Sequence, residues 1–133
     1  MKKIAVVEDN PDSRELLRII LESFYEVTEY ETGGEALEGI RMNKPDLVLL
    51  DISLPHMDGL QVVQRLRDDE ALKKIPIVAI TAYAMAGDRE KYLSAGFNDY
   101  IAKPIIDETI LLAIIERWMK YPEKPEDNEN PDC

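Results

Sequence analysis

Three short runs along the chain are wholly apolar, at residues 4–7, 47–50 and 77–80. Such a run between polar stretches is typical of a strand buried on both faces, as in the centre of a parallel sheet. Residues 25–30 alternate better than these runs, with Tyr25 and Val27 against Glu26 and Thr28, which favours a half-exposed edge strand. The mixed run at residues 99–102 is a fifth strand, which we also place at an edge.

Apolar residues at helical spacing fill the intervals between these strands and predict five helices. Their start and stop signals are Asn10-Pro11, Gly33-Gly34, Asp58 and Asp107 at the beginnings and Gly96 after the fourth helix. The fourth helix is short, at about residues 88–95. In the other four, the apolar positions expected to share a face are, in chain order, Leu16, Leu17, Ile20, Leu21 and Phe24; Ala36, Leu37 and Ile40; Leu60, Val63 and Leu66; and Ile110, Leu111, Ile114, Ile115 and Trp118.

Strand and helix therefore alternate five times with short connections, which implies parallel strands joined by right-handed crossovers. With the wholly apolar strands in the centre, we predict an α/β, flavodoxin-like doubly wound sandwich. Its five-stranded parallel sheet has the order 2-1-3-4-5, with helices on both faces. We expect one domain over residues 1–120 and a disordered, acidic, Pro-rich tail or linker over residues 121–133.

Composition narrows the function classes. The formal net charge of −11 disfavours direct binding to nucleic acid, whose phosphates need a basic surface. Because the chain has neither an apolar run long enough to cross a bilayer nor a signal-peptide pattern, we expect a cytoplasmic protein without membrane contact. The single cysteine, Cys133, excludes an internal disulfide and a metal site built from several thiolates.

Polar side chains stand at the ends of four predicted strands: Glu8 and Asp9, Asp51, Thr81, and Lys103. Because parallel strands end at the same edge of a sheet, we expect these side chains to lie together. Clustered carboxylates repel one another, and Mg²⁺, which prefers a few carboxylates plus water, would relieve that repulsion. Lys103 is suited to hold a phosphate oxygen, and Thr81 offers a hydroxyl donor.

These groups are the parts needed for phosphoryl transfer onto Asp51, with an acyl phosphate as the product. Each residue taken singly also has a structural explanation. Glu8 and Asp9 precede a helix start, where the helix dipole favours anions. Thr81 can cap a loop, and Lys103 can be a solvated loop charge. The combination, at these strand ends and in this order, favours the chemical interpretation.

The same residues resemble the response-regulator receiver domains of two-component signalling, the CheY-like family, over about residues 2–120. The resemblance rests on Glu8-Asp9, on L-L-D-I-S-L-P-H-M-D-G around Asp51, on Thr81-Ala82 and on Lys103-Pro104. It implies a phosphoacceptor switch rather than an enzyme with a separate substrate.

The resemblance also implies site roles. Asp51 would accept the phosphoryl group from a phosphohistidine of a sensor histidine kinase or a phosphotransfer protein. Glu8 (partly through water), Asp9 and Asp51 would bind Mg²⁺ together with the backbone carbonyl of Ser53.

Further roles follow from the resemblance at the other strand ends. Thr81 and Lys103 would bind phosphoryl oxygens, and the Lys103-Pro104 bond is expected to be cis. Phosphorylation would draw in Thr81, and Tyr100 would swing into the space vacated, changing a surface made by the fourth helix, fifth strand and fifth helix. Alternatively, Tyr100 is an edge-strand aromatic residue that only covers a helix.

Some positions and partners stay open. Glu8 replaces the family's usual Asp, Ser53 and Tyr83 occupy positions that tune acyl-phosphate lifetime, and His56 is expected to be an ordinary surface residue. The expected partners are the phosphodonor, a downstream effector protein and, on phosphorylation, a second copy of the chain. The alternatives are a receiver fragment of a hybrid kinase, a phosphorelay intermediate, or an aspartyl-phosphate phosphatase-type enzyme.

Overall fold

The computed structural model of the chain describes residues 1–82, 88–105 and 107–122. The elements in these ranges are β1 (Lys3–Val7), α1 (Pro11–Leu21), β2 (Glu26–Tyr30), α2 (Gly33–Met42), β3 (Leu47–Asp51), α3 (Gly59–Asp68), β4 (Ile77–Thr81), α4 (Asp88–Ala95), β5 (Asp99–Ala102) and α5 (Glu108–Lys120).

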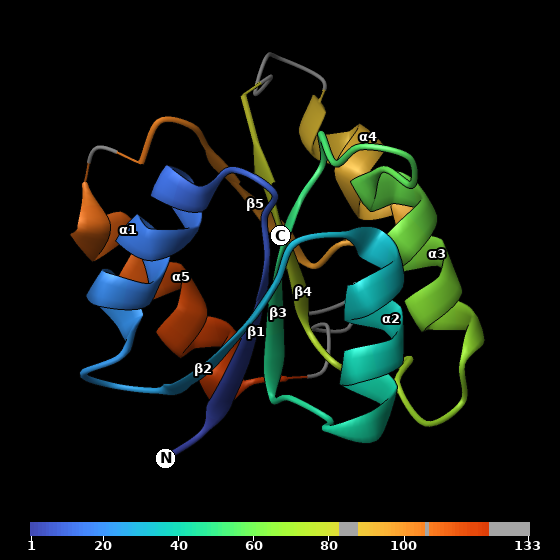
Figure 1. Ribbon diagram of the computed structural model, residues 1–133, viewed down its shortest axis with the longest axis horizontal. Helices are drawn as coiled ribbons and strands as arrows, with labels where there is room; N and C mark the ends of the chain where they lie inside the picture. Colours follow the sequence, from blue (N-terminus) through green and yellow to red (C-terminus); the bar gives the residue numbers. More distant parts are fainter. Residues whose placement is uncertain (83–87, 106, 123–133) are drawn as a thin grey trace, which may run out of the picture.

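The strands form one parallel sheet in the order β2-β1-β3-β4-β5. Figure 1 shows α1 and α5 over one face of this sheet and α2, α3 and α4 over the other. The predicted flavodoxin-like sandwich is therefore confirmed. Residues 83–87, 106 and 123–133 lie outside the described ranges, so the predictions for Tyr83, Cys133 and a disordered tail remain predictions.

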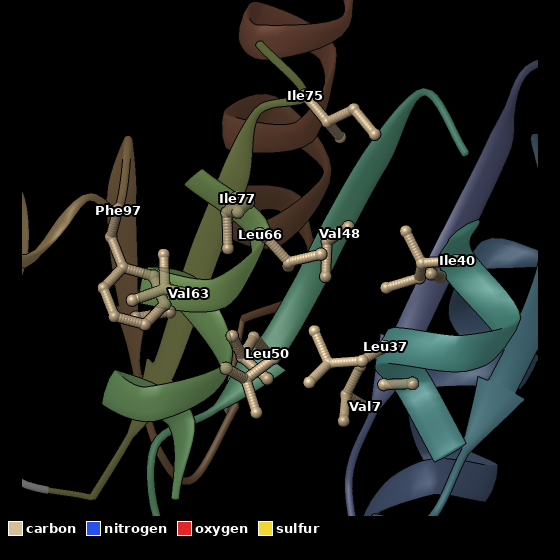
Figure 2. Packing of buried hydrophobic residues seen from close by; sticks show 14 of the residues in the cluster. Val7, Leu37, Ile40, Val48, Leu50, Val63, Leu66, Ile75, Ile77 and Phe97 are labelled. Atoms are coloured by element: carbon tan, nitrogen blue, oxygen red, sulfur yellow. The ribbon is translucent and has the colours of Figure 1, made fainter. Parts of the chain in front are cut away.

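The central strands carry the core on both of their faces. In β3, Leu47 and Leu49 point to the side of α1 and α5, whereas Val48 and Leu50 point to the side of α2 and α3. Figure 2 shows side chains of α2 and α3, such as Leu37 and Leu66, directed at the strands in the core on that side of the sheet. Full burial on both faces explains why these strands are apolar at successive positions.

The edge positions of β2 and β5 are confirmed, and β2 is half-exposed as predicted, although its burial does not alternate from residue to residue. Val27 and Thr28 are both half-buried in β2. An edge strand has a helix on one face and partial cover on the other, so successive side chains can both be shielded in part.

The faces of three helices differ from the prediction in detail. Leu16 in α1 and Ile110 in α5 are 45% and 55% exposed, and Phe24, which follows the end of α1, is 57% exposed. Leu60 and Ile114 are only half-buried. A helix that packs on a sheet buries one stripe, so apolar residues at its border stay in contact with solvent. The buried positions are Leu17, Ile20 and Leu21 in α1, Val62, Val63 and Leu66 in α3, and Leu111, Ile115, Trp118 and Met119 in α5.

The expected helix caps are present. Asn10 accepts a hydrogen bond from the Ser13 backbone, and Asp58 forms a capping box with Gln61. Gly96, directly after α4, has a φ of 119°, a conformation that favours glycine. None of the helices in the described ranges combines the length and the apolar character that crossing a membrane would require.

Candidate functional site

The polar side chains at the strand ends lie at one edge of the sheet. The register pairs Val7 with Leu50, Asp51 with Ile80, and Thr81 with Ala102, so neighbouring strands end level with one another. This brings the residues that follow β1 and β5 next to those that end β3 and β4. As expected, the acidic residues and Lys103 lie close together at this edge.

Three carboxylates form the acidic part of the site. Glu8, Asp9 and Asp51 each offer an oxygen, and these oxygens lie within 4.8 Å of one another. Glu8 and Asp51 are 0% and 3% exposed, whereas Asp9 is open to solvent. Burial, and to a smaller extent the charge of Asp51, raises the pKa of Glu8 above its ordinary value.

Lys103 partly balances this negative charge. Its Nζ lies 2.9 Å from Glu8 Oε1 and 3.2 Å from Asp51 Oδ2. Burial alone would lower the pKa of Lys103, but the close ion pair with Glu8 and the charge of Asp51 outweigh it and raise that pKa. Lys103 is therefore a cation held between the two buried carboxylates. The Lys103-Pro104 peptide bond is cis, as expected.

The carboxylates have capacity left for a metal ion. Glu8 Oε1 lies within ion-pair distance of Lys103, yet it accepts no hydrogen bond of good geometry from any described residue. A buried oxygen in this state is costly, and a bound cation would satisfy it. The donor set consists of oxygens alone and includes a solvent-exposed member, a combination that fits Mg²⁺ with part of its water shell.

The Asp51 carboxylate is oriented by its own loop. The Ser53 backbone N–H donates to Asp51 Oδ1 at 3.0 Å, while Oδ2 faces Lys103. The role predicted for the Ser53 carbonyl stays a prediction. His56 in the same loop is exposed, with a φ of 66°, and its predicted surface position is confirmed.

Gly59 permits the start of α3 to approach the end of β3. A Cβ at Gly59 would lie 2.6 Å from the Asp51 carbonyl oxygen and 2.8 Å from Ile52 Cα, closer than any side chain fits. The glycine is therefore required by the backbone next to Asp51. From the sequence, Gly59 indicated only a turn before the helix, and its close contact with the Asp51 backbone could not be predicted.

Thr81 stands at the same edge but is engaged with α4. Its buried hydroxyl shares a hydrogen bond of 3.0 Å with the hydroxyl of Tyr92. Tyr100 is half-buried, and its ring centroid lies 5.8 Å from that of Tyr92, so Tyr100 does cover a helix. Sequence reasoning did not identify Tyr92. The available signal was the one aromatic residue of α4, directly after four charged residues.

Comparisons with known proteins agree with this geometry. Residues 4–116 match the model of the response regulator receiver domain. The chain is 46% identical over 105 residues to the polar-differentiation response regulator DivK of Brucella ovis, covering 78% of this chain and 85% of that protein.

Solved structures are similar over nearly the whole chain. The receiver domain of the sensor histidine kinase PA1611 from Pseudomonas aeruginosa PAO1, determined with a magnesium ion coordinated in the active site cleft, matches with a TM-score of 0.82 and 38% identity. That match covers 90% of this chain and 98% of the other. A CheY-like receiver domain protein from Methanospirillum hungatei JF-1 matches with a TM-score of 0.82 and 29% identity, covering 92% and 96% of the two chains. The chain therefore belongs to the response regulator receiver domain family of two-component signalling.

Proposed function

We propose that this chain is a phosphoacceptor switch that takes a phosphoryl group onto Asp51 from a phosphohistidine of a sensor histidine kinase or phosphotransfer protein. The observation that carries the proposal is the contact of Lys103 with both Glu8 and Asp51, beside the exposed carboxylate of Asp9. A cation and three carboxylates at strand ends match the charge that phosphoryl transfer must stabilise.

In the proposed step, an Asp51 carboxylate oxygen attacks phosphorus. The bond from phosphorus to the donor imidazole nitrogen breaks, and its electron pair leaves with that nitrogen. Lys103 donates a hydrogen bond to Asp51 Oδ2 in the unphosphorylated chain, and it would donate to a phosphoryl oxygen once Asp51 is phosphorylated. Thr81 would donate its hydroxyl proton in a hydrogen bond to another phosphoryl oxygen. The product is an acyl phosphate, with Asp51 as the covalent carrier.

Glu8, Asp9 and Asp51, with the Ser53 carbonyl, would hold Mg²⁺ in this reaction. When bound, Mg²⁺ would neutralise charge on the phosphoryl oxygens. The unsatisfied Glu8 Oε1 and the oxygen-only donor set support this assignment, as does the magnesium ion in the PA1611 receiver domain.

A surface beside the site is suited to the phosphodonor. A groove next to Lys103 is lined by Leu16, Ala82 and Ile105, and Ile19 of α1 is 53% exposed nearby along the same helix. Exposed apolar side chains that adjoin a reaction site are typical of a protein-docking surface.

The output would be a changed surface on α4, β5 and α5. In the proposed change Thr81 is drawn towards the phosphoryl group and Tyr100 moves inward. A groove on this side is lined by Arg89, Tyr100 and Ile110, among others. A downstream effector or a second copy of the chain would bind there.

Dimerisation is tested by light scattering and crosslinking after full phosphorylation, and an unchanged monomer would contradict it.

A stand-alone regulator, a phosphorelay intermediate and a receiver of a hybrid kinase would all use the same Asp51 chemistry. The DivK relative is a response regulator, whereas the PA1611 neighbour is the receiver domain of a sensor kinase. In each case the proposed reaction is phosphorylation of Asp51 itself, and the chain has no separate substrate.

The test is intact mass after incubation with acetyl phosphate, with and without Mg²⁺, with Asp51→Asn as the control. We expect one added phosphoryl group that requires both Mg²⁺ and Asp51. No gain, together with no Mg²⁺ binding, would contradict the switch. Sustained release of phosphate from p-nitrophenyl phosphate by the wild-type chain would instead indicate the phosphatase-type enzyme.

A further inference from the structure

Tyr92 is the buried residue of α4, a helix that has four charged residues in its first four positions. In α4 it is the residue shielded from solvent, at 2% exposure. Its hydroxyl meets the Thr81 hydroxyl at 3.0 Å, and Thr81 is itself 0% exposed. This contact joins α4 directly to the end of β4, where the phosphoryl group is expected to bind.

The Tyr92 ring is held in place by two aromatic neighbours. It meets Phe97 edge-on, with centroids 6.2 Å apart, and meets Tyr100 at 5.8 Å in a tilted arrangement. The hydroxyl is therefore presented to Thr81 by a packed ring, and Tyr100 of β5 lies against the same ring. One residue thus touches both groups that the proposed switch requires to move.

Thr81 must change partners to act on a phosphoryl group. Among the described residues its hydroxyl shares a hydrogen bond with Tyr92 and none with Asp51 or Lys103, which contact each other at 3.2 Å. Threonine is branched at Cβ and has few χ1 positions. Turning its hydroxyl towards Asp51 therefore takes it away from Tyr92.

We propose that Tyr92 is a positioning residue that holds the Thr81 hydroxyl in the unphosphorylated chain, so that phosphorylation of Asp51 has to break the Thr81–Tyr92 hydrogen bond. The inference rests on the proposed function, because it takes Thr81 as a ligand of the phosphoryl group. It gives Tyr92 a specific role: its hydroxyl biases the chain towards the inactive state and lowers its apparent affinity for a phosphoryl group.

The test uses beryllofluoride, which mimics a phosphoryl group on a carboxylate, in the presence of Mg²⁺. Tyr92→Phe keeps the ring and its packing and removes only the hydroxyl. We expect it to bind beryllofluoride about two- to tenfold more tightly than the wild type, the range set by the loss of one neutral hydrogen bond. Tyr121→Phe removes the hydroxyl of a residue that is 60% exposed, and it should leave the affinity unchanged.

A double-mutant cycle assigns the effect to the right pair of residues. The double variant Thr81→Val/Tyr92→Phe should bind beryllofluoride with the same affinity as the single variant Thr81→Val. An equal gain in both backgrounds would show that the Tyr92 hydroxyl acts through another group, and would overturn the proposal.

The outcomes separate this inference from the proposed function. Wild-type binding that needs Mg²⁺ and Asp51, combined with equal or weaker binding by Tyr92→Phe, would overturn the role of Tyr92 and leave the switch intact. Absence of wild-type binding would overturn both. Should Tyr92→Phe fail to fold, the wild-type tyrosine Cζ resonances give the answer: the Tyr92 signal should shift on saturation with beryllofluoride, and an unmoved signal would contradict the proposal.

Discussion

At the scale of single residues, the site is defined by an imbalance of charge. One ammonium, that of Lys103, faces the carboxylates of Glu8 and Asp51, and Asp9 adds a third negative group at the mouth. Opposite charges at these distances attract strongly where water is partly excluded, and like charges repel for the same reason. The remaining negative charge favours a divalent cation.

Asp9→Asn should therefore separate metal binding from folding. Asp9 is exposed, so we expect the free energy of unfolding without metal to change by about 0.5 kcal/mol or less. The rise in Tm caused by Mg²⁺ in the wild type should be largely lost, because a ligand stabilises the fold only through its affinity for the native state. Thermal unfolding over a series of Mg²⁺ concentrations gives both quantities.

The control is Asp12→Asn, which removes an exposed acid in the first turn of α1 and should keep the wild-type response to Mg²⁺. An equal response to Mg²⁺ in Asp9→Asn and the wild type would contradict the assignment of Asp9 as a ligand.

Residues that directly end or follow a strand could be placed from the sequence. Asp51 and Lys103 are brought together by strand order and register, which the apolar runs already indicated. The Thr81–Tyr92 bond could not be predicted, because it depends on how α4 sits on the sheet. That helix has little amphipathic pattern from which its orientation could be inferred.

At the scale of elements, α3 begins against the backbone of Asp51. Gly59→Ala should lower the free energy of unfolding by about 1–3 kcal/mol, since the new methyl group would clash with main-chain atoms. It should also weaken phosphorylation at Asp51 by displacing that strand end. Urea unfolding and intact mass after acetyl phosphate treatment measure the two effects.

Gly34→Ala is the matched control within α2. A Cβ at Gly34 meets nothing within 4 Å, so alanine should stabilise the fold by about 0.4–1 kcal/mol through the unfolded state. Equal effects of the two substitutions would show that the contact of Gly59 with Asp51 is unimportant.

The start of α5 should give the stability a dependence on pH. Hydrogen bonds from Thr109 lower the pKa of the N-cap residue Asp107 below its ordinary value of 3.8. A carboxyl whose pKa is lower in the folded state stabilises the fold above the unfolded pKa, and this contribution is lost as the pH falls. Asp107→Ala should therefore lower Tm at pH 7, with a difference from the wild type that shrinks below about pH 4. A difference that stays constant from pH 7 to pH 3 would contradict this account.

Helix positions were predictable from the sequence, whereas the borders of their buried faces were not. The caps at Asn10, Asp58 and Asp107 depend on local chemistry and are where the sequence placed them. The exposure of Leu16 and Ile110 depends on the rotation of each helix about its axis, which is set by packing against the neighbouring elements.

At the scale of the whole molecule, the order of the strands creates the site. Placing β1 between β2 and β3 aligns the ends of β1, β3, β4 and β5 along one edge. The sequence placed the wholly apolar strands in the centre and the less apolar β2 and β5 at the edges, an assignment that fits this order. The core and the chemistry thus depend on the same arrangement, in which α1 and α5 cover one face of the sheet and α2, α3 and α4 cover the other (Figure 1).

The central claim is that Asp51, and not a neighbouring carboxylate, carries the phosphoryl group. Sodium borohydride reduces an acyl phosphate to an alcohol, so reduction of the phosphorylated wild-type chain should convert Asp51 to homoserine. Digestion and tandem mass spectrometry would locate the change, and a sample without Mg²⁺ would be the control. We predict homoserine at position 51 alone, dependent on Mg²⁺. Reduction at Glu8 or Asp9, or an unmodified Asp51 in a chain that has gained a phosphoryl group, would contradict the account.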